Sequence, residues 1–209
     1  MIAATIARRS LLAGAGAALL AAPARASADL TPRAVRFIEE RGRQVIDVVN
    51  GPGTAEEKRA TVAAILRETV DIRGVAQFVL GRHWRTASEA QRGAYLQLFE
   101  EVLVRNLSAR FGEIAGASFT VARSMMASEE EAVVSTVVNR PNAPSVTLDW
   151  RVAVVDGVPK VVDVVAEGTS LRITQRSEYS AVVQRDGGID GLLRAMRRQL
   201  AQLAQAEPR

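Results

Sequence analysis

Through the first half of the chain, apolar residues recur every three or four positions, a spacing that predicts amphipathic helices. The longest run predicts a helix that begins near Thr86 or Ser88 and ends near residue 111. Its apolar stripe consists of Tyr95, Leu98, Phe99, Val102, Leu103, Leu107 and Phe111. Three shorter helices are predicted upstream from their start signals, which are Thr31 before Pro32, a capping box of Thr54 and Glu57, and Asp71.

Beyond residue 118 the pattern changes to an alternation that is typical of β-strands. Strands are predicted over residues 119–126, 132–140, 145–155 and 158–165. Asp156 and Gly157, between the last two, are a strong signal for a tight hairpin, so we expect an antiparallel meander. One helix is predicted after Gly168, and another after Gly187 and Gly188. The order of elements predicts an α+β fold, with helices packed on a four-stranded antiparallel sheet.

Residues 1–28 have the pattern of a secretory signal peptide. Arg8 and Arg9 precede an apolar run that is too short to cross a bilayer, and small residues at 26–28 fit a cleavage site. The arginine pair is compatible with a Sec signal and with a twin-arginine signal. Either route predicts a periplasmic protein whose mature domain is residues 29–209.

Composition narrows the classes of function. The net charge of +4 includes three arginines of residues 1–28, so the mature chain carries only +1 and gives no indication of nucleic-acid binding. The absence of cysteine excludes disulfides, thiolate metal sites and a lipoprotein anchor. We expect neither a metal nor a cofactor.

Catalytic side chains are scarce. His83 is the single histidine, and its setting after Gly81 fits a hydrogen-bonded loop residue better than a base or a pH switch. Asp163 and Glu167 lie four residues apart near the end of the last predicted strand, where they could act as an acid–base pair. A salt bridge to a nearby arginine is the commoner explanation of such a carboxylate.

The predicted strands are rich in adjacent valines, such as Val133 with Val134 and Val161 with Val162. Adjacent strand residues point to opposite faces, so both faces of the sheet are expected to be apolar. Helices that stand off one face would leave an apolar cavity, whereas helices that pack closely would give an ordinary core. The periodicity alone favours the ordinary, closely packed core over the cavity.

Two blocks of sequence resemble the MlaC / toluene-tolerance family. The first is residues 78–85 (Phe-Val-Leu-Gly-Arg-His-Trp-Arg), followed by the aromatic helix segment 95–99. The second is residues 161–171, continued by Gln-Arg-Ser-Glu-Tyr at 175–179. The order of elements agrees over essentially the whole mature chain. His83 departs from the pattern, because many relatives carry tyrosine there, and the resemblance implies no role for it.

This resemblance implies an NTF2-like fold that holds acyl chains in an apolar pocket between sheet and helices. It implies a periplasmic phospholipid carrier, the solute-binding component of an Mla-type ABC transport system that moves lipid between the outer and inner membranes. The implied partners are an inner-membrane complex with an MCE-domain subunit and an outer-membrane lipoprotein. Three alternatives stay open. One is a hopanoid carrier of the same family, and another is a small NTF2-like enzyme that uses Asp163, Glu167 and Tyr95 on an apolar substrate. The last is an adaptor that only binds partner proteins and has a solid core without a cavity.

We therefore expect a lipid-binding wall where the long-helix stripe faces the sheet. The predicted wall residues are Phe78, Val79, Trp84, Tyr95, Phe99, Leu103, Val137, Leu148, Trp150, Val152, Val162 and Val164. Arginines of the final helix can bind carboxylates or phosphates in a bidentate way. Arg194, Arg197 and Arg198 are the candidates for docking to a membrane partner, although a solvated basic face explains them equally well.

Overall fold

The structure is a computed structural model that describes residues 29–141 and 143–206. Its helices are α1 (Thr31–Asn50), α2 (Ala55–Thr69), α3 (Ile72–Leu80), α4 (His83–Thr86), α5 (Glu89–Ser108), α6 (Phe111–Ile114), α7 (Leu171–Arg185) and α8 (Gly188–Ala206). Its strands are β1 (Ser118–Met126), β2 (Glu131–Arg140), β3 (Ala143–Val155), β4 (Val158–Ala166) and β5 (Thr169–Ser170). The predicted signal peptide, residues 1–28, lies outside the described residues.

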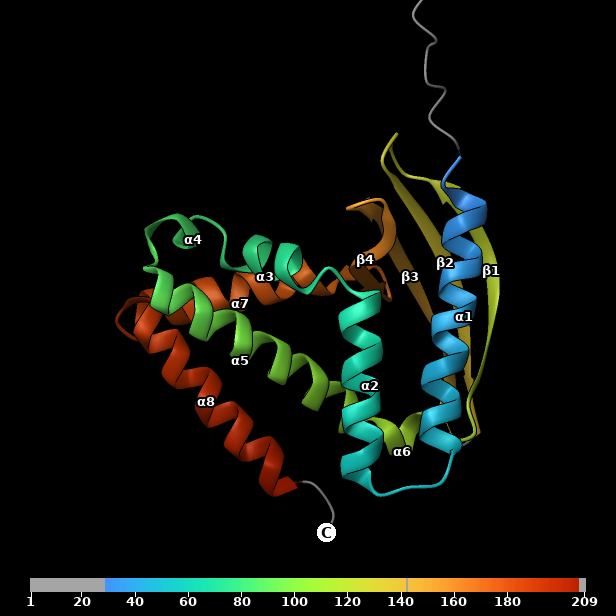
Figure 1. Cartoon of the computed structure of the whole chain (residues 1–209), viewed down its shortest axis with the longest axis horizontal. Coiled ribbons are helices and arrows are strands. Elements are labelled where there is room, and N and C mark those ends of the chain that lie inside the picture. The colour runs from blue at the N-terminus through green and yellow to red at the C-terminus, as the bar shows by residue number, and fades with distance from the viewer. Residues whose placement is uncertain (1–28, 142, 207–209) are drawn as a thin grey trace, which may run out of the picture.

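The elements form two groups that lie side by side. Helix α1 runs along the sheet, while α3, α5, α7 and α8 gather in a separate layer on the other side of α2 (Figure 1). The chain therefore has two places where apolar side chains are buried. None of the helices in the described part of the chain is both long enough and apolar enough to cross a membrane.

Thr31 was expected to cap the first helix, but this prediction is wrong: Leu30 occupies the N-cap position and no side chain caps α1. The helix starts predicted at Thr54, Asp71 and Ser88 are confirmed by their caps. The Thr54 hydroxyl accepts the Glu57 N–H, and the Glu57 carboxylate accepts the Thr54 N–H, which completes the capping box. Asp71 caps α3 by accepting the Gly74 N–H at 3.0 Å. The long helix ends earlier than predicted, because the backbone of Arg110 leaves the helical range (φ −98°, ψ 3°) and α6 begins as a separate turn.

The α+β class with an antiparallel sheet is confirmed, but the predicted strand number is wrong. The sheet has five strands in the order β1-β2-β3-β4-β5. Glu167 and Gly168 both adopt positive φ, at 50° and 79°, so the chain turns back tightly and pairs two more residues with β4 before Ser170 caps α7. The Asp156–Gly157 hairpin is present as predicted, also with positive φ at both residues.

One face of the sheet, here called the inner face, packs against α1. The buried residues of this sheet core are Leu30, Ala34, Ile38, Ala132, Val134, Val152 and Val161. Strand register aligns Ala132 with Val152 and Val134 with Trp150, which places alternate residues on the inner face. The opposite, outer face carries polar side chains between its valines; on it the Arg123 Nε–H donates to the Ser135 hydroxyl at 3.0 Å.

The second core lies wholly among helices. This helical core consists of Ala76, Val79, Leu80, Ala87, Tyr95, Leu98, Phe99, Val102, Tyr179, Val183, Ile189, Leu192, Leu193, Met196 and Leu200. The rings of Tyr95 and Phe99 lie 6.3 and 6.4 Å from that of Tyr179, both edge to face. The expectation that the α5 stripe faces the sheet is wrong for its first half, because Tyr95, Leu98, Phe99 and Val102 belong to the helical core with residues of α8, α7 and α3.

Candidate functional site

The twelve predicted wall residues fall into three groups. Those that are buried in the helical core or packed against it are Phe78, Val79, Trp84, Tyr95 and Phe99. Those that belong to the sheet core or pack against it are Trp150, Val152 and Val164. Those that are half-buried outside both cores are Leu103, Val137, Leu148 and Val162. The prediction of one continuous wall is therefore wrong, because α5 lies in the helical layer.

Two of the predicted positions are also misplaced within the sheet. Val137 pairs with Thr147, whereas its neighbour Thr136 pairs with Leu148. Because successive strand residues alternate between faces, Val137 lies on the outer face and cannot share a wall with Leu148. Val162 lies where the register shifts between β3 and β4, as the extra residue of a bulge.

Part of the inner face remains incompletely covered. We call this part the inner-face patch, and its residues are Phe119, Val138, Val146, Leu148 and Ala166. The register aligns Phe119 with Val138 and Val146, and aligns Leu148 with Ala166. All five side chains are half-buried, whereas the sheet-core residues further along the same face are almost fully buried. The patch is thus an apolar surface of the sheet that is partly accessible to a ligand.

Only Leu148 of this patch was a predicted wall residue. The alternation of strand residues could have indicated the other four, because they point to the same face of the sheet as Trp150. The polar atoms of this face are satisfied internally: the Trp150 indole N–H donates to the Thr136 hydroxyl at 2.9 Å, and that hydroxyl donates to the Leu148 carbonyl. The inner face therefore presents carbon, with few unsatisfied polar groups, to whatever lies against it.

A groove of about 420 Å³ in the surface of the described residues lies between α1 and β1, and Phe119 of the inner-face patch lines it together with Glu39, Arg43 and Asp47 of α1. Another, of about 180 Å³, lies between α7 and α8. None of the twelve predicted wall residues lines either groove.

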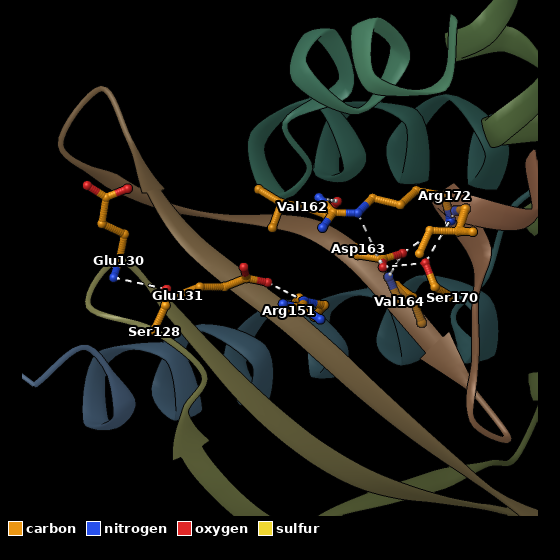
Figure 2. A network of polar contacts seen from close by, with 10 residues as sticks. Ser128, Glu130, Glu131, Arg151, Val162, Asp163, Val164, Ser170 and Arg172 are labelled. Atoms are coloured by element: carbon orange, nitrogen blue, oxygen red, sulfur yellow. Dashed lines mark hydrogen bonds and ion pairs between the residues drawn. The ribbon is translucent and has the colours of Figure 1, made fainter. Parts of the chain in front are cut away.

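A buried carboxylate joins the sheet to the helical layer. Asp163 on β4 is 5% exposed and accepts the backbone N–H groups of Val164 and Arg172, at 2.8 and 3.2 Å. Its other oxygen accepts the Ser170 hydroxyl at 2.6 Å and lies 3.4 Å from Arg172 Nε (Figure 2). Arg172 Nη1 also donates to the Val162 carbonyl. Asp163 therefore serves structure at the start of α7, where a helix favours negative charge.

This geometry does not assemble the acid–base site of the enzyme alternative. Glu167 is exposed in the turn after β4, whereas Asp163 is buried and paired. Tyr95 lies in the helical core, where its hydroxyl donates to the Ala76 carbonyl at 3.0 Å and burial raises its pKa. His83 begins α4 half-buried, and its Nε2 has no hydrogen-bond partner among the described residues. Within the described residues, no three metal-ligating side chains gather.

The candidate docking arginines on α8 are exposed, but two of them contact the chain itself. Arg194 donates to the Asp186 carbonyl at 3.1 Å, and Arg198 lies 3.9 Å from the Asp186 carboxylate. A hydrogen bond from Arg185 is the main cause that lowers the pKa of Asp186. These contacts tie α8 to the end of α7 and leave Arg197 projecting from the exposed side of α8.

Comparison with known proteins identifies the family. A family model described as MlaC protein matches residues 40–198. A solved phospholipid-binding protein from Ralstonia solanacearum, in complex with a phospholipid, superposes with a TM-score of 0.74 at 23% sequence identity, over 82% of this chain and 98% of that one. The structural match shows that the fold is shared, and the family model covers most of the chain. The chain belongs to the MlaC family.

Proposed function

We propose that this protein is a periplasmic phospholipid carrier, the solute-binding component of an Mla-type ABC transport system between the outer and inner membranes. The family match over residues 40–198 is the observation that carries the proposal. Its partners are then an inner-membrane complex with an MCE-domain subunit and an outer-membrane lipoprotein. The phospholipid bound to the Ralstonia solanacearum relative supports the choice of cargo, and the NTF2-like description of the fold belongs to the same proposal.

The physical requirement on such a carrier is simple. Each methylene group exposed to water costs about 0.8 kcal/mol, so two acyl chains cannot cross an aqueous space unless a protein covers them. The inner-face patch offers half-buried aliphatic and aromatic side chains for this purpose. Leu148 belongs to the patch, Trp150 lies two residues further along β3 on the same face, and we propose that acyl chains lie against both.

A bulky residue at the patch tests the proposed site. In Leu148→Trp the larger side chain displaces about two methylene groups of a bound chain, each worth about 0.8 kcal/mol, so lipid occupancy should fall by about tenfold. Native mass spectrometry of the purified mature protein measures the occupancy and identifies the lipid as phospholipid or hopanoid. Val158→Trp is the matched control, because Val158 is 49% exposed at the β3–β4 hairpin. Equal occupancy in both variants and in the wild type would show that lipid binds elsewhere.

Export provides a second test of the proposed location. We propose that residues 1–28 direct the protein through the inner membrane and are then removed. The intact mass of protein from the periplasmic fraction should correspond to a chain that begins near Asp29. A chain that retains Met1, or that stays in the cytoplasmic fraction, would contradict the proposed carrier role.

A further inference from the structure

Two arginines share one aromatic ring at the junction between the helical layer and the sheet. Arg172 and Arg176 lie four residues apart on α7, and their guanidinium carbons lie 4.6 and 5.0 Å from the centre of the Phe78 ring. Residues at this spacing are neighbours on a helix surface, where two like charges repel each other. The arrangement therefore concentrates positive charge beside Phe78, which itself packs against the helical core.

Only one of these charges is neutralised by the protein. Arg172 is paired with the buried Asp163 and donates to the Val162 carbonyl, so it belongs to the internal network of β4. Arg176 is exposed, and no carboxylate lies within ion-pair distance of it in the part of the chain that the structure describes. The cluster thus has two guanidinium groups for one carboxylate, and the unbalanced charge is that of Arg176.

The Arg176 guanidinium is held in place although it has no acidic partner. It stacks on Phe78, and it also lies against Gly81 at the end of α3, where a Cβ atom would come within 3.1–3.3 Å of its Nη2, Cζ and Nε atoms. Gly81 has φ +57°, so glycine suits both the backbone conformation and the close approach. A planar guanidinium fixed in this way has donors available for a bidentate anion at a small cost in side-chain entropy.

We propose that Arg176, supported by Arg172, binds the phosphate group of the carried lipid. This inference rests on the proposed carrier function and adds a headgroup determinant to it. The cluster adjoins β4 at Val162 and Asp163, and the next paired residue, Val164, lies on the inner face beside Trp150. A lipid whose chains follow the inner face can therefore place its phosphate at the exposed guanidinium, where the headgroup stays in water. The shared chemistry is a phosphate oxyanion, and its source is the lipid.

The test compares two lipids that differ only in the phosphate. The mature protein is loaded from neutral detergent micelles that contain equal amounts of dioleoyl phosphatidic acid and dioleoylglycerol, and bound lipid is quantified by mass spectrometry after gel filtration. We expect the wild type to prefer phosphatidic acid by about tenfold, the effect of a charge-assisted bidentate contact. Arg176→Gln should abolish the preference while it still binds dioleoylglycerol. Arg36→Gln, which removes an exposed arginine from α1, should keep the preference.

Further arms separate the possible failures. Arg176→Lys keeps the positive charge but loses the planar, bidentate guanidinium, so it should show an intermediate preference for phosphatidic acid. This variant serves as the test if Arg176→Gln loses thermal stability. A wild-type preference in both Arg176 variants would overturn the phosphate site while the carrier function stands. Failure of the wild type to load either lipid would overturn both proposals. Titration of inorganic phosphate into the protein should give no binding below about 1 mM; tighter binding that Arg176→Gln removes would assign the site to free phosphate instead.

Discussion

Replacement of Asp163 by asparagine should destabilise the fold far more than loss of an ordinary surface charge. The Asp163 side chain is 2% exposed and accepts four contacts: two from backbone N–H groups, one from the Ser170 hydroxyl and one from the Arg172 guanidinium. Asparagine keeps the size and one acceptor oxygen. It places an NH₂ group where the second oxygen met Ser170 and Arg172, so that two donors face each other across this contact.

The magnitude follows from what remains unpaired. Hydrogen bonds to a charged group contribute about 1.5–3 kcal/mol, and removal of one partner of a buried ion pair costs about 3–5 kcal/mol. The Arg172 side chain is 23% exposed, so water recovers part of this loss. We therefore expect Asp163→Asn to lower the free energy of unfolding by about 2–4 kcal/mol. For a domain of this size the corresponding fall in Tm is about 10 °C.

Urea denaturation followed by circular dichroism measures the free energy of unfolding of the wild type and of Asp163→Asn, and thermal melts give the Tm of each. The matched control is Asp47→Asn, since Asp47 is exposed on α1 and substitutions at such surface positions usually change the free energy of unfolding by no more than about 0.5 kcal/mol. A double-mutant cycle with Arg172→Gln should give a coupling energy of at least about 1 kcal/mol. If the two asparagine variants lose equal stability, the interpretation of Asp163 as the buried link to α7 is refuted.

Two further predictions concern the stability of the fold at alkaline pH and the docking of the protein to a membrane partner. Burial raises the pKa of both tyrosines of the chain, Tyr95 and Tyr179, above the unfolded value of about 10. Their contribution to stability is therefore complete below pH 10, and the free energy of unfolding should fall by about 1.4 kcal/mol per tyrosine for each pH unit above it. In a pH titration the tyrosinate absorbance should rise together with unfolding, and a rise that precedes unfolding would contradict the burial of the two rings. Replacement of the three arginines Arg194, Arg197 and Arg198 by glutamate should slow lipid transfer to the membrane-bound partner and make the transfer rate less sensitive to salt, while lipid retention stays unchanged. A transfer assay at low and high salt measures the rate. A rate that neither salt nor the substitutions alter would show that docking occurs elsewhere.

Local features of the fold could be predicted because their signals are local. The capping box of Thr54 and Glu57 and the hairpin at Asp156 and Gly157 involve residues at most three positions apart, and both are present. The fifth strand was missed because Ser170 is at once a strand residue and the cap of α7. A two-residue strand has no period that a pattern could reveal.

The candidate site was harder to predict because it depends on which elements face each other. The stripe on α5 correctly indicates a buried face, but the stripe is the same whether the neighbour is a sheet or another helix. The structure packs it on α8, which moves Tyr95 and Phe99 out of any wall formed with Trp150. Val137 was misassigned for another reason: adjacent valines point to opposite faces, and the sequence does not show which face meets α1.

The junction between the two cores is mostly polar, and this matters for a carrier. On β4 the Val161 carbonyl accepts the Asp71 N–H, Lys160 donates to carbonyls at the end of α2, and Arg172 donates to the Val162 carbonyl. Such bonds exchange for bonds to water at a net cost of only about 0.5–1.5 kcal/mol each. Each core, by contrast, is closed by its own apolar residues. A shift of the helical layer against the sheet would therefore expose little buried carbon, and its main cost would be the buried contacts that Asp163 makes with Ser170 and Arg172. In the proposed function, cargo exchange needs such a movement, because chains that are fully covered in the carrier cannot leave it while the cover stays closed.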